Sequence, residues 1–211
     1  MIDVLKLRKR IGQLGMLLPW LVLALSLIFG YGFPESISAT YYIPNCITPF
    51  MIILGSAGIL LVCYKGYDLH DKIVCTAAGI FGLGICLFPC ALADDIIINV
   101  GTFGIPSNIS GIIHNICAIL FFGLLSYNSI FLFTKSSGDM TSEKLKRNII
   151  YRVCGYGMIG SFILLIPFNL LDISIGIWIV EAIALTFFGI SWLTKSESYS
   201  LLFKDKNLSK G

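Results

Sequence analysis

The sequence predicts an all-α membrane protein, a polytopic bundle of six transmembrane helices with both termini cytoplasmic. Hydrophobic residues make up 56% of the 211 residues and charged residues only 13%, whereas soluble domains carry about 25% charged residues. Six apolar runs approach the roughly 20 residues that cross a bilayer. Because no linker, low-complexity segment or convincing repeat divides the chain, we expect a single integral membrane domain over residues 1–211.

Each predicted helix follows from one apolar run. The first run follows the basic segment "KLRKR" and has no small-residue cleavage site after it, so we expect an uncleaved span. The second run is short, so its helix is expected to begin within the preceding loop. A brief turn at 171–173 separates the last two runs, which predicts an antiparallel helical hairpin. The expected spans are about 11–31, 48–64, 73–92, 110–133, 149–170 and 174–194.

The positions of the cations predict the orientation. All fifteen Lys and Arg residues lie in the N-terminal tail, after the second span, after the fourth span, or in the C-terminal tail. Cytoplasmic loops are enriched in Lys and Arg, so both termini are expected in the cytoplasm, in a plasma membrane or bacterial inner membrane. We therefore attribute the net charge of +3 to cations that orient the helices and contact anionic lipid headgroups. We expect no nucleic-acid partner.

The first outward loop, "FPESISATYYIPN" (Phe33 to Asn45), is polar and aromatic and carries no cation. Its alternation of polar and apolar residues has the period of two that is typical of an extended segment. We expect this segment to lie as a lid over an outward-facing pocket. The inward segment "YKGYDLHDK" (Tyr64 to Lys72) also contains tyrosines, which we expect to anchor at the headgroups.

Two ionisable residues lie inside the predicted spans, His114 in the fourth and Glu181 in the sixth. Such residues are costly in hydrocarbon and are functional by default. Two interpretations stay open: the two side chains hydrogen-bond and lock two helices together, or they form a polar site that opens outward. The expected ligand-binding residues are Glu35, Ser36, Ser38, Tyr41, Tyr42, Asp94, Asp95, His114 and Glu181.

Several kinds of chemistry are compatible with these residues. Ser110 lies four residues before His114 on the same helical face, so Ser110, His114 and Glu181 are candidates for a serine–histidine–acid set, although no nucleophile-elbow motif is present. The chain has only two histidines, which excludes a three-histidine zinc centre. We predict no metal and no cofactor. A disulfide between Cys46 and Cys90 is a further hypothesis, restricted to an oxidising compartment.

Three segments resemble a known family. They are "PESIS" (Pro34 to Ser38), "HNICAILFFG" (His114 to Gly123) and "EAIALTFFGISWLTK" (Glu181 to Lys195). With six spans and both ends inside, the chain resembles the Frag/DRAM/Sfk group of eukaryotic membrane proteins and their uncharacterised bacterial relatives. The resemblance implies lipid-linked biology: lipid-anchor remodelling in one branch, and lipid distribution or membrane signalling in others. It assigns no catalytic residue.

Three functions follow from these patterns. The first is a non-catalytic protein that binds or organises membrane lipids, its expected partners, through an outward-facing polar pocket. The alternative is a membrane-embedded lipid-modifying enzyme, a hydrolase or transferase that uses His114 and Glu181. The third is a small-solute or proton-coupled transporter with Glu181 as the titrating carboxylate, which ranks last because transporters usually show inverted repeats. Oligomeric state is left open.

Overall fold

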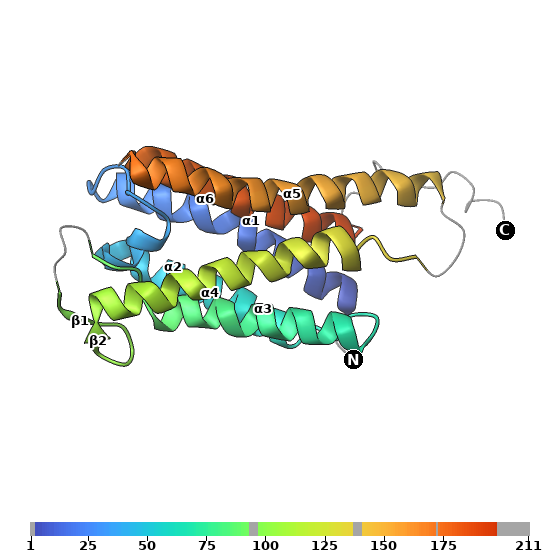
Figure 1. Cartoon of the computed structure of the whole chain (residues 1–211), viewed down its shortest axis with the longest axis horizontal. Coiled ribbons are helices and arrows are strands. Elements are labelled where there is room, and N and C mark those ends of the chain that lie inside the picture. Colours follow the sequence, from blue (N-terminus) through green and yellow to red (C-terminus); the bar gives the residue numbers. More distant parts are fainter. Residues whose placement is uncertain (1–2, 93–96, 137–140, 172, 198–211) are drawn as a thin grey trace.

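The computed structural model describes residues 3–92, 97–136, 141–171 and 173–197. It is an all-α bundle of six helices, each long and apolar enough to cross a membrane, which confirms the predicted fold class (Figure 1). The helices are α1 (Val4–Ile28), α2 (Pro44–Val62), α3 (Leu69–Leu87), α4 (Ser107–Tyr127), α5 (Ser142–Leu170) and α6 (Ser174–Lys195).

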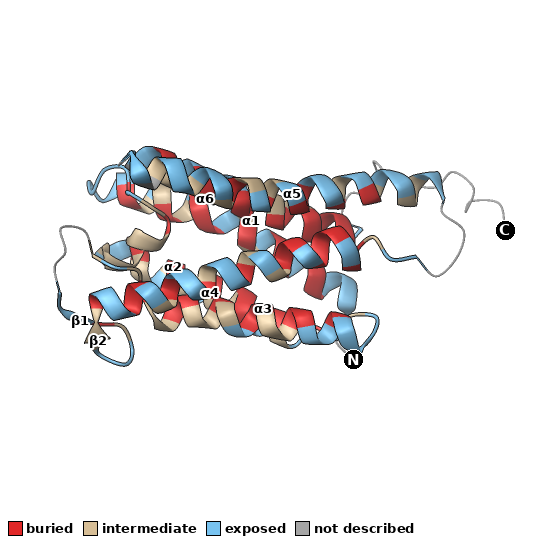
Figure 2. Cartoon of the chain, viewed as in Figure 1, coloured by how far each residue is buried: buried red, intermediate tan, exposed pale blue. Residues whose placement is uncertain are grey.

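The helices form a ring in which each packs on its neighbours in sequence, and α6 packs on α1 to close it. Helices α5 and α6 form the hairpin that the brief turn at 171–173 predicted, and they are the most extensive helix pair. The α4–α5 pair is the least extensive of the six. Buried and exposed residues alternate along the helices (Figure 2). The contact between α4 and α5 is therefore the weakest seam in the wall.

The two ends of the bundle differ in charge. We call the end that carries the start of α1, the α2–α3 and α4–α5 connections and the end of α6 the basic end. Every Lys and Arg among the described residues lies in these connections or within the adjacent three helical turns. The opposite end carries the 3-10 helix η1 (Ser38–Tyr42) and is called the η1 end. In Figure 1 the basic end lies to the right and the η1 end to the left.

The helix boundaries differ from the predicted ones in physically interpretable ways. Helix α1 begins at Val4 rather than near residue 11, because the Asp3 carboxylate accepts hydrogen bonds from the N–H groups of Leu5 and Lys6 and caps a helix start in the basic segment. Helix α2 begins at Pro44, within the preceding loop as expected. Helix α4 continues as the π-helical turn η3 (Asn128–Leu132).

The predicted extended conformation of residues 36–43 is wrong, because residues 38–42 form the 3-10 helix η1. Ser36 Oγ accepts a hydrogen bond from Ala39 N at 2.9 Å, and Thr40 Oγ1 donates to Ile37 O. These local side-chain bonds favour a turn over a strand. Ile37 and Thr40, three residues apart, are the buried pair, which is the spacing of a 3-10 helix.

A short β-hairpin precedes α4 and was not predicted. Strand β1 (Asn99–Val100) pairs antiparallel with β2 (Ile105–Pro106), with Val100 opposite Ile105. Gly101 and Gly104 both have positive φ in the turn, a conformation that glycine adopts without steric cost. The hairpin returns the chain directly into α4 at Ser107.

Glycines allow two helix pairs to approach closely, as expected from small residues in membrane helices. A Cβ atom added to Gly79 of α3 would lie 2.5 Å from the carbonyl oxygen of Gly58 in α2. A Cβ atom on Gly189 of α6 would lie 2.9 Å from the carbonyl oxygen of Gly12 in α1. These contacts hold the ring tightly on the sides away from α4 and α5.

Candidate functional site

A cavity of about 1000 Å³ occupies the η1 half of the ring and is lined by all six helices and by residues 35–39. This volume lies at the upper end of the usual range for small-molecule sites, about 300–1,000 Å³. Its polar residues are Glu35, Ser36, Ser38, His114, Asn115, Ser161 and Glu181. Most other lining residues are apolar, so the cavity is amphipathic.

The cavity reaches the lateral surface of the bundle between α4 and α5. Asn115 and Ile119 from α4, and Ile166 and Leu170 from α5, line it and are also exposed on the outside. Nearer the basic end the seam closes, because the rings of Phe122 and Phe162 lie 5.0 Å apart. A molecule dissolved in the surrounding bilayer therefore has a sideways route into the cavity.

Glu181 lies two turns into α6, as the sequence predicted, and is half-buried against the cavity. Its Oε2 accepts a hydrogen bond of 2.5 Å from the backbone N–H of Ile37. This bond attaches the loop before η1 to α6 and draws the Ile37 side chain into the core, where it is 3% exposed. The backbone N–H of Ser38 is a second donor to this carboxylate, and the Glu181 side chain also lines the cavity.

His114 lies on α4 and is buried at 4% exposure. Its Nδ1 is 2.8 Å from the carbonyl oxygen of Phe88, and its Nε2 is 3.1 Å from Ser38 Oγ. A carbonyl only accepts, so Nδ1 carries a proton and donates. The neutral tautomer then accepts from the Ser38 hydroxyl at Nε2, and His114 joins the end of α3 and the η1 loop to α4.

His114 and Glu181 do not hydrogen-bond to each other, which corrects the interpretation that the two pair directly. They instead contact consecutive residues of one loop, Ser38 and Ile37. Each helix is thereby locked to the loop rather than to the other helix. This arrangement positions both polar side chains on the wall of the cavity.

The candidate set of Ser110, His114 and Glu181 is not assembled. Ser110 is fully buried and its hydroxyl donates to the carbonyl oxygen of Pro89 at 2.7 Å. The serine that reaches His114 is Ser38 from the distant η1 loop. Helical spacing favoured Ser110 in the sequence, and no local pattern reveals a partner 76 residues away.

The other expected binding residues divide into two groups. Glu35 and Ser36 line the cavity next to Ser38. Tyr41 and Tyr42 do not line it; their rings pack edge to face with centroids 5.3 Å apart, and Tyr42 donates to the carbonyl oxygen of Cys90 at 2.6 Å. Burial raises the pKa of the Tyr42 phenol to about 12, so the hydroxyl stays protonated. Asp94 and Asp95 lie outside the described residues.

The two cysteines of the hypothesised disulfide are free thiols. Cys46 lies in the first turn of α2 instead of the loop, is fully buried, and its Sγ is 3.4 Å from the carbonyl oxygen of Val22. Within the described part of the chain, no three His, Cys, Asp or Glu residues cluster in a way that could hold a metal ion.

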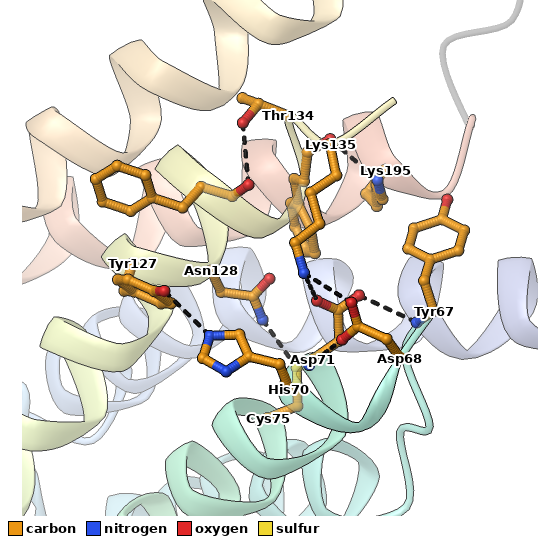
Figure 3. A network of polar contacts seen from close by, with 12 residues as sticks. Tyr67, Asp68, His70, Asp71, Cys75, Tyr127, Asn128, Thr134, Lys135 and Lys195 are labelled. Carbon is orange, nitrogen blue, oxygen red and sulfur yellow. Dashed lines mark hydrogen bonds and ion pairs between the residues drawn. The ribbon is translucent and has the colours of Figure 1, made fainter. Parts of the chain in front are cut away.

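A second polar cluster occupies the basic end and differs from the first (Figure 3). Lys135 bridges two carboxylates, with Nζ 2.9 Å from Asp68 Oδ2 and 3.0 Å from Asp71 Oδ1. Asp71 Oδ2 also accepts from the N–H of Tyr67. Next to this network Asn128 donates to Cys75 Sγ. The cluster ties the α2–α3 connection to the end of α4.

Aromatic rings fill the space beside this network. Lys195 Nζ donates to the carbonyl oxygen of Phe133 and lies 4.7 Å from the ring centroid of Tyr67. The Arg8 Nε donates to the hydroxyl of Tyr64, whose ring is 2% exposed. Tyr64 is therefore an internal residue, and its expected role as a headgroup anchor is wrong.

Comparison with known proteins gives no relative: the chain matches no protein-family model, no curated protein and no solved structure. The resemblance to the Frag/DRAM/Sfk group therefore stays a prediction, and the functional argument depends on the geometry of the cavity.

Proposed function

We propose that the protein binds a single membrane lipid, without catalysis, in the cavity at the η1 end. The observation that carries this proposal is the amphipathic cavity with a lateral opening between α4 and α5. A lipid has the same division into a polar head and an apolar chain. The polar wall at Glu35, Ser36 and Glu181 takes the headgroup, and the apolar wall takes the acyl chain.

The acyl chain has a continuous apolar surface to follow. Ala118 and Phe122 on α4 and Phe162 and Leu165 on α5 all line the cavity. Entry is lateral, from the leaflet at the η1 end. With the orientation that the cations predict, this is the outer leaflet.

Binding fits better than passage of a solute through the bundle. Trp192, Phe133 and Tyr151 lie at the basic end, and each is at most 3% exposed. None of the three lines the cavity. The cavity therefore ends within the bundle, which supports a binding role over the transporter hypothesis.

The test is lipid retention after purification in a mild detergent, measured by native mass spectrometry. We expect one bound lipid for the wild type and loss of most of it in Ala118→Phe, because the added ring fills the apolar wall. The control is Ile112→Phe, which adds similar bulk on α4 at a position 61% exposed on the outside. Equal retention in Ala118→Phe and wild type contradicts the proposal.

One contact favours a second candidate, the lipid-modifying enzyme. The Ser38 hydroxyl next to His114 Nε2 is the arrangement of a nucleophile and its general base, and both residues line the cavity. Acyl transfer also needs donors for an oxyanion. The nearby N–H of Ile37 instead donates to Glu181, so a carboxylate lies where negative charge would develop.

The two candidates separate in one experiment. An enzyme that uses Ser38 would react with a fluorophosphonate probe, and Ser38→Ala would abolish labelling. We expect no labelling of the wild-type protein, with retention of lipid by both forms. Ser38-dependent labelling would establish the catalytic alternative.

A further inference from the structure

The polar end of the cavity has an unusual balance of charge. Its ionisable lining residues are Glu35, Glu181, Cys90 and His114, and none of the lining residues is Lys or Arg. His114 donates to a carbonyl at Nδ1 and meets a hydroxyl at Nε2, which the neutral ring satisfies. The cations of the described chain lie at the basic end. A headgroup in this cavity therefore meets carboxylates without a compensating positive charge.

The backbone donors at this end are already occupied. The N–H groups of Ile37 and Ser38 donate to Glu181, the N–H of Ala39 donates to Ser36 Oγ, and the N–H of Thr40 donates to the carbonyl oxygen of Ile37. The carboxylates of Glu181 and Glu35 line the cavity and are acceptors. A phosphate offers only more acceptors and more negative charge.

The state of a neighbouring thiol agrees with this field. Cys90 also lines the cavity. Burial, and then the charges of Glu181 and Glu35, raise the pKa of the Cys90 thiol to about 12. Burial and the two carboxylate charges, which together disfavour a thiolate, also disfavour any anionic group placed beside it.

Building on the lipid-binding function proposed above, we propose that the site selects a lipid whose headgroup donates hydrogen bonds and carries no phosphate or other anion. Hydroxyl or ammonium groups of such a headgroup bind the carboxylates of Glu181 and Glu35. Phospholipids with anionic headgroups, although attracted to the basic end, are excluded from the cavity.

The test is competition for the cavity in detergent micelles with the full-length protein. A fluorescent diacylglycerol is displaced by unlabelled diacylglycerol, sphingosine or phosphatidic acid, and Ala118→Phe defines the signal that does not come from the cavity. We expect phosphatidic acid to compete at least tenfold more weakly than diacylglycerol. Sphingosine, with its ammonium group, competes at least as well as diacylglycerol.

Charge-neutral variants assign the effect to the two carboxylates. Glu181→Gln should weaken competition by sphingosine and strengthen competition by phosphatidic acid, each at least threefold and in opposite directions. Glu35→Gln, at an exposed position that leaves folding intact, should give the same signs with a smaller size. The control Asp3→Asn removes a carboxylate at the basic end while keeping a helix cap, and should change neither.

The possible results separate a failure of the headgroup selectivity from a failure of lipid binding itself. Phosphatidic acid competing as well as diacylglycerol, or unchanged preferences in both glutamine variants, overturns the headgroup selectivity and leaves lipid binding intact. Failure of the wild-type protein to bind the fluorescent diacylglycerol and to retain any other lipid overturns lipid binding and, with it, the selectivity.

Discussion

The two ends of this bundle differ in how closely their side chains are packed. At the basic end, large aromatic side chains fill the space between the helices: Tyr64 and Phe133 each place a ring about 5 Å from Trp192. At the η1 end, the cavity wall includes the small residues Ala118 and Ala184. Six similarly apolar helices thus give a closed end and an open end.

The polar groups follow the same division. At the basic end Asp71 and Lys135 satisfy each other and fix the connections. At the η1 end Glu181 accepts hydrogen bonds from a loop and also lines a cavity. The Asp71–Lys135 pair faces no cavity, although Glu143 Oε2, Asn148 Oδ1 and Thr194 Oγ1 at the same end have no hydrogen-bond partner among the described residues. We infer that the basic end serves stability and that the η1 end serves binding.

Truncation of large residues gives the sharpest test of this difference. Trp192→Ala should lower the free energy of unfolding by about 3–5 kcal/mol, because it opens a void in a closely packed interior. Leu165→Ala should cost less than about 1 kcal/mol, since Leu165 already borders the cavity. Thermal unfolding in detergent measures both. Similar losses in the two variants would show that the η1 end is as tightly packed as the basic end.

The sequence predicted the architecture because that information is local. Apolar runs of span length gave six helices, and the cations marked which connections share an end. The high free-energy cost of an ionisable side chain inside a membrane span was enough to identify His114 and Glu181 as candidates. The contacts of these residues were not predictable, because Ile37 and Ser38 reach them through the tertiary fold over 144 and 76 residues.

The pattern of polar residues in the sequence also led to two wrong predictions. The alternation of polar and apolar residues predicted an extended segment at residues 36–43, where side-chain bonds to the backbone instead produce η1. Spacing on one helical face suggested Ser110, which the fold turns toward Pro89. In both cases a competing hydrogen bond decided the conformation, and periodicity carries no information about such a partner.

The basic end also provides a comparison of two carboxylates that share one lysine. The Asp71 side chain is 5% exposed and that of Asp68 is 51% exposed. Asp71→Asn should lower the free energy of unfolding by about 2 kcal/mol, because charged hydrogen bonds are lost in a buried setting. Asp68→Asn keeps the helix cap at an exposed position and should leave the free energy of unfolding close to that of wild type. Chemical denaturation of both variants measures the difference, and equal losses would contradict a closed basic end.

A smaller effect is expected for Tyr42, which stabilises the η1 end from outside the cavity. Tyr42→Phe removes the hydrogen bond to the Cys90 carbonyl and should lower the free energy of unfolding by about 1 kcal/mol. Because Tyr42 does not line the cavity, the affinity for lipid should stay within twofold of wild type. A larger loss of binding would show that the position of Cys90 controls the cavity.

The smallest effect concerns pH. A hydrogen bond from the Asp71 N–H, and then Lys135, lower the pKa of Asp68, while hydrogen bonds from Asp68 and then Asp71 raise the pKa of Lys135. The lowered pKa of Asp68 contributes stability that is fully present above the ordinary aspartate pKa of about 4 and is lost as the pH falls through the lowered pKa. The raised pKa of Lys135 contributes stability that is fully present below the ordinary lysine pKa of about 10.4 and is lost as the pH rises through the raised pKa.

Between pH 5 and pH 9 neither Asp68 nor Lys135 titrates. The difference in unfolding free energy between wild type and Lys135→Met should therefore stay constant within about 0.5 kcal/mol, as is usual for a partly exposed pair. A difference that changes more than this inside the window, measured by denaturation at each pH, would mean that another titrating group is coupled to Lys135 and that the basic end is not the self-contained network described above.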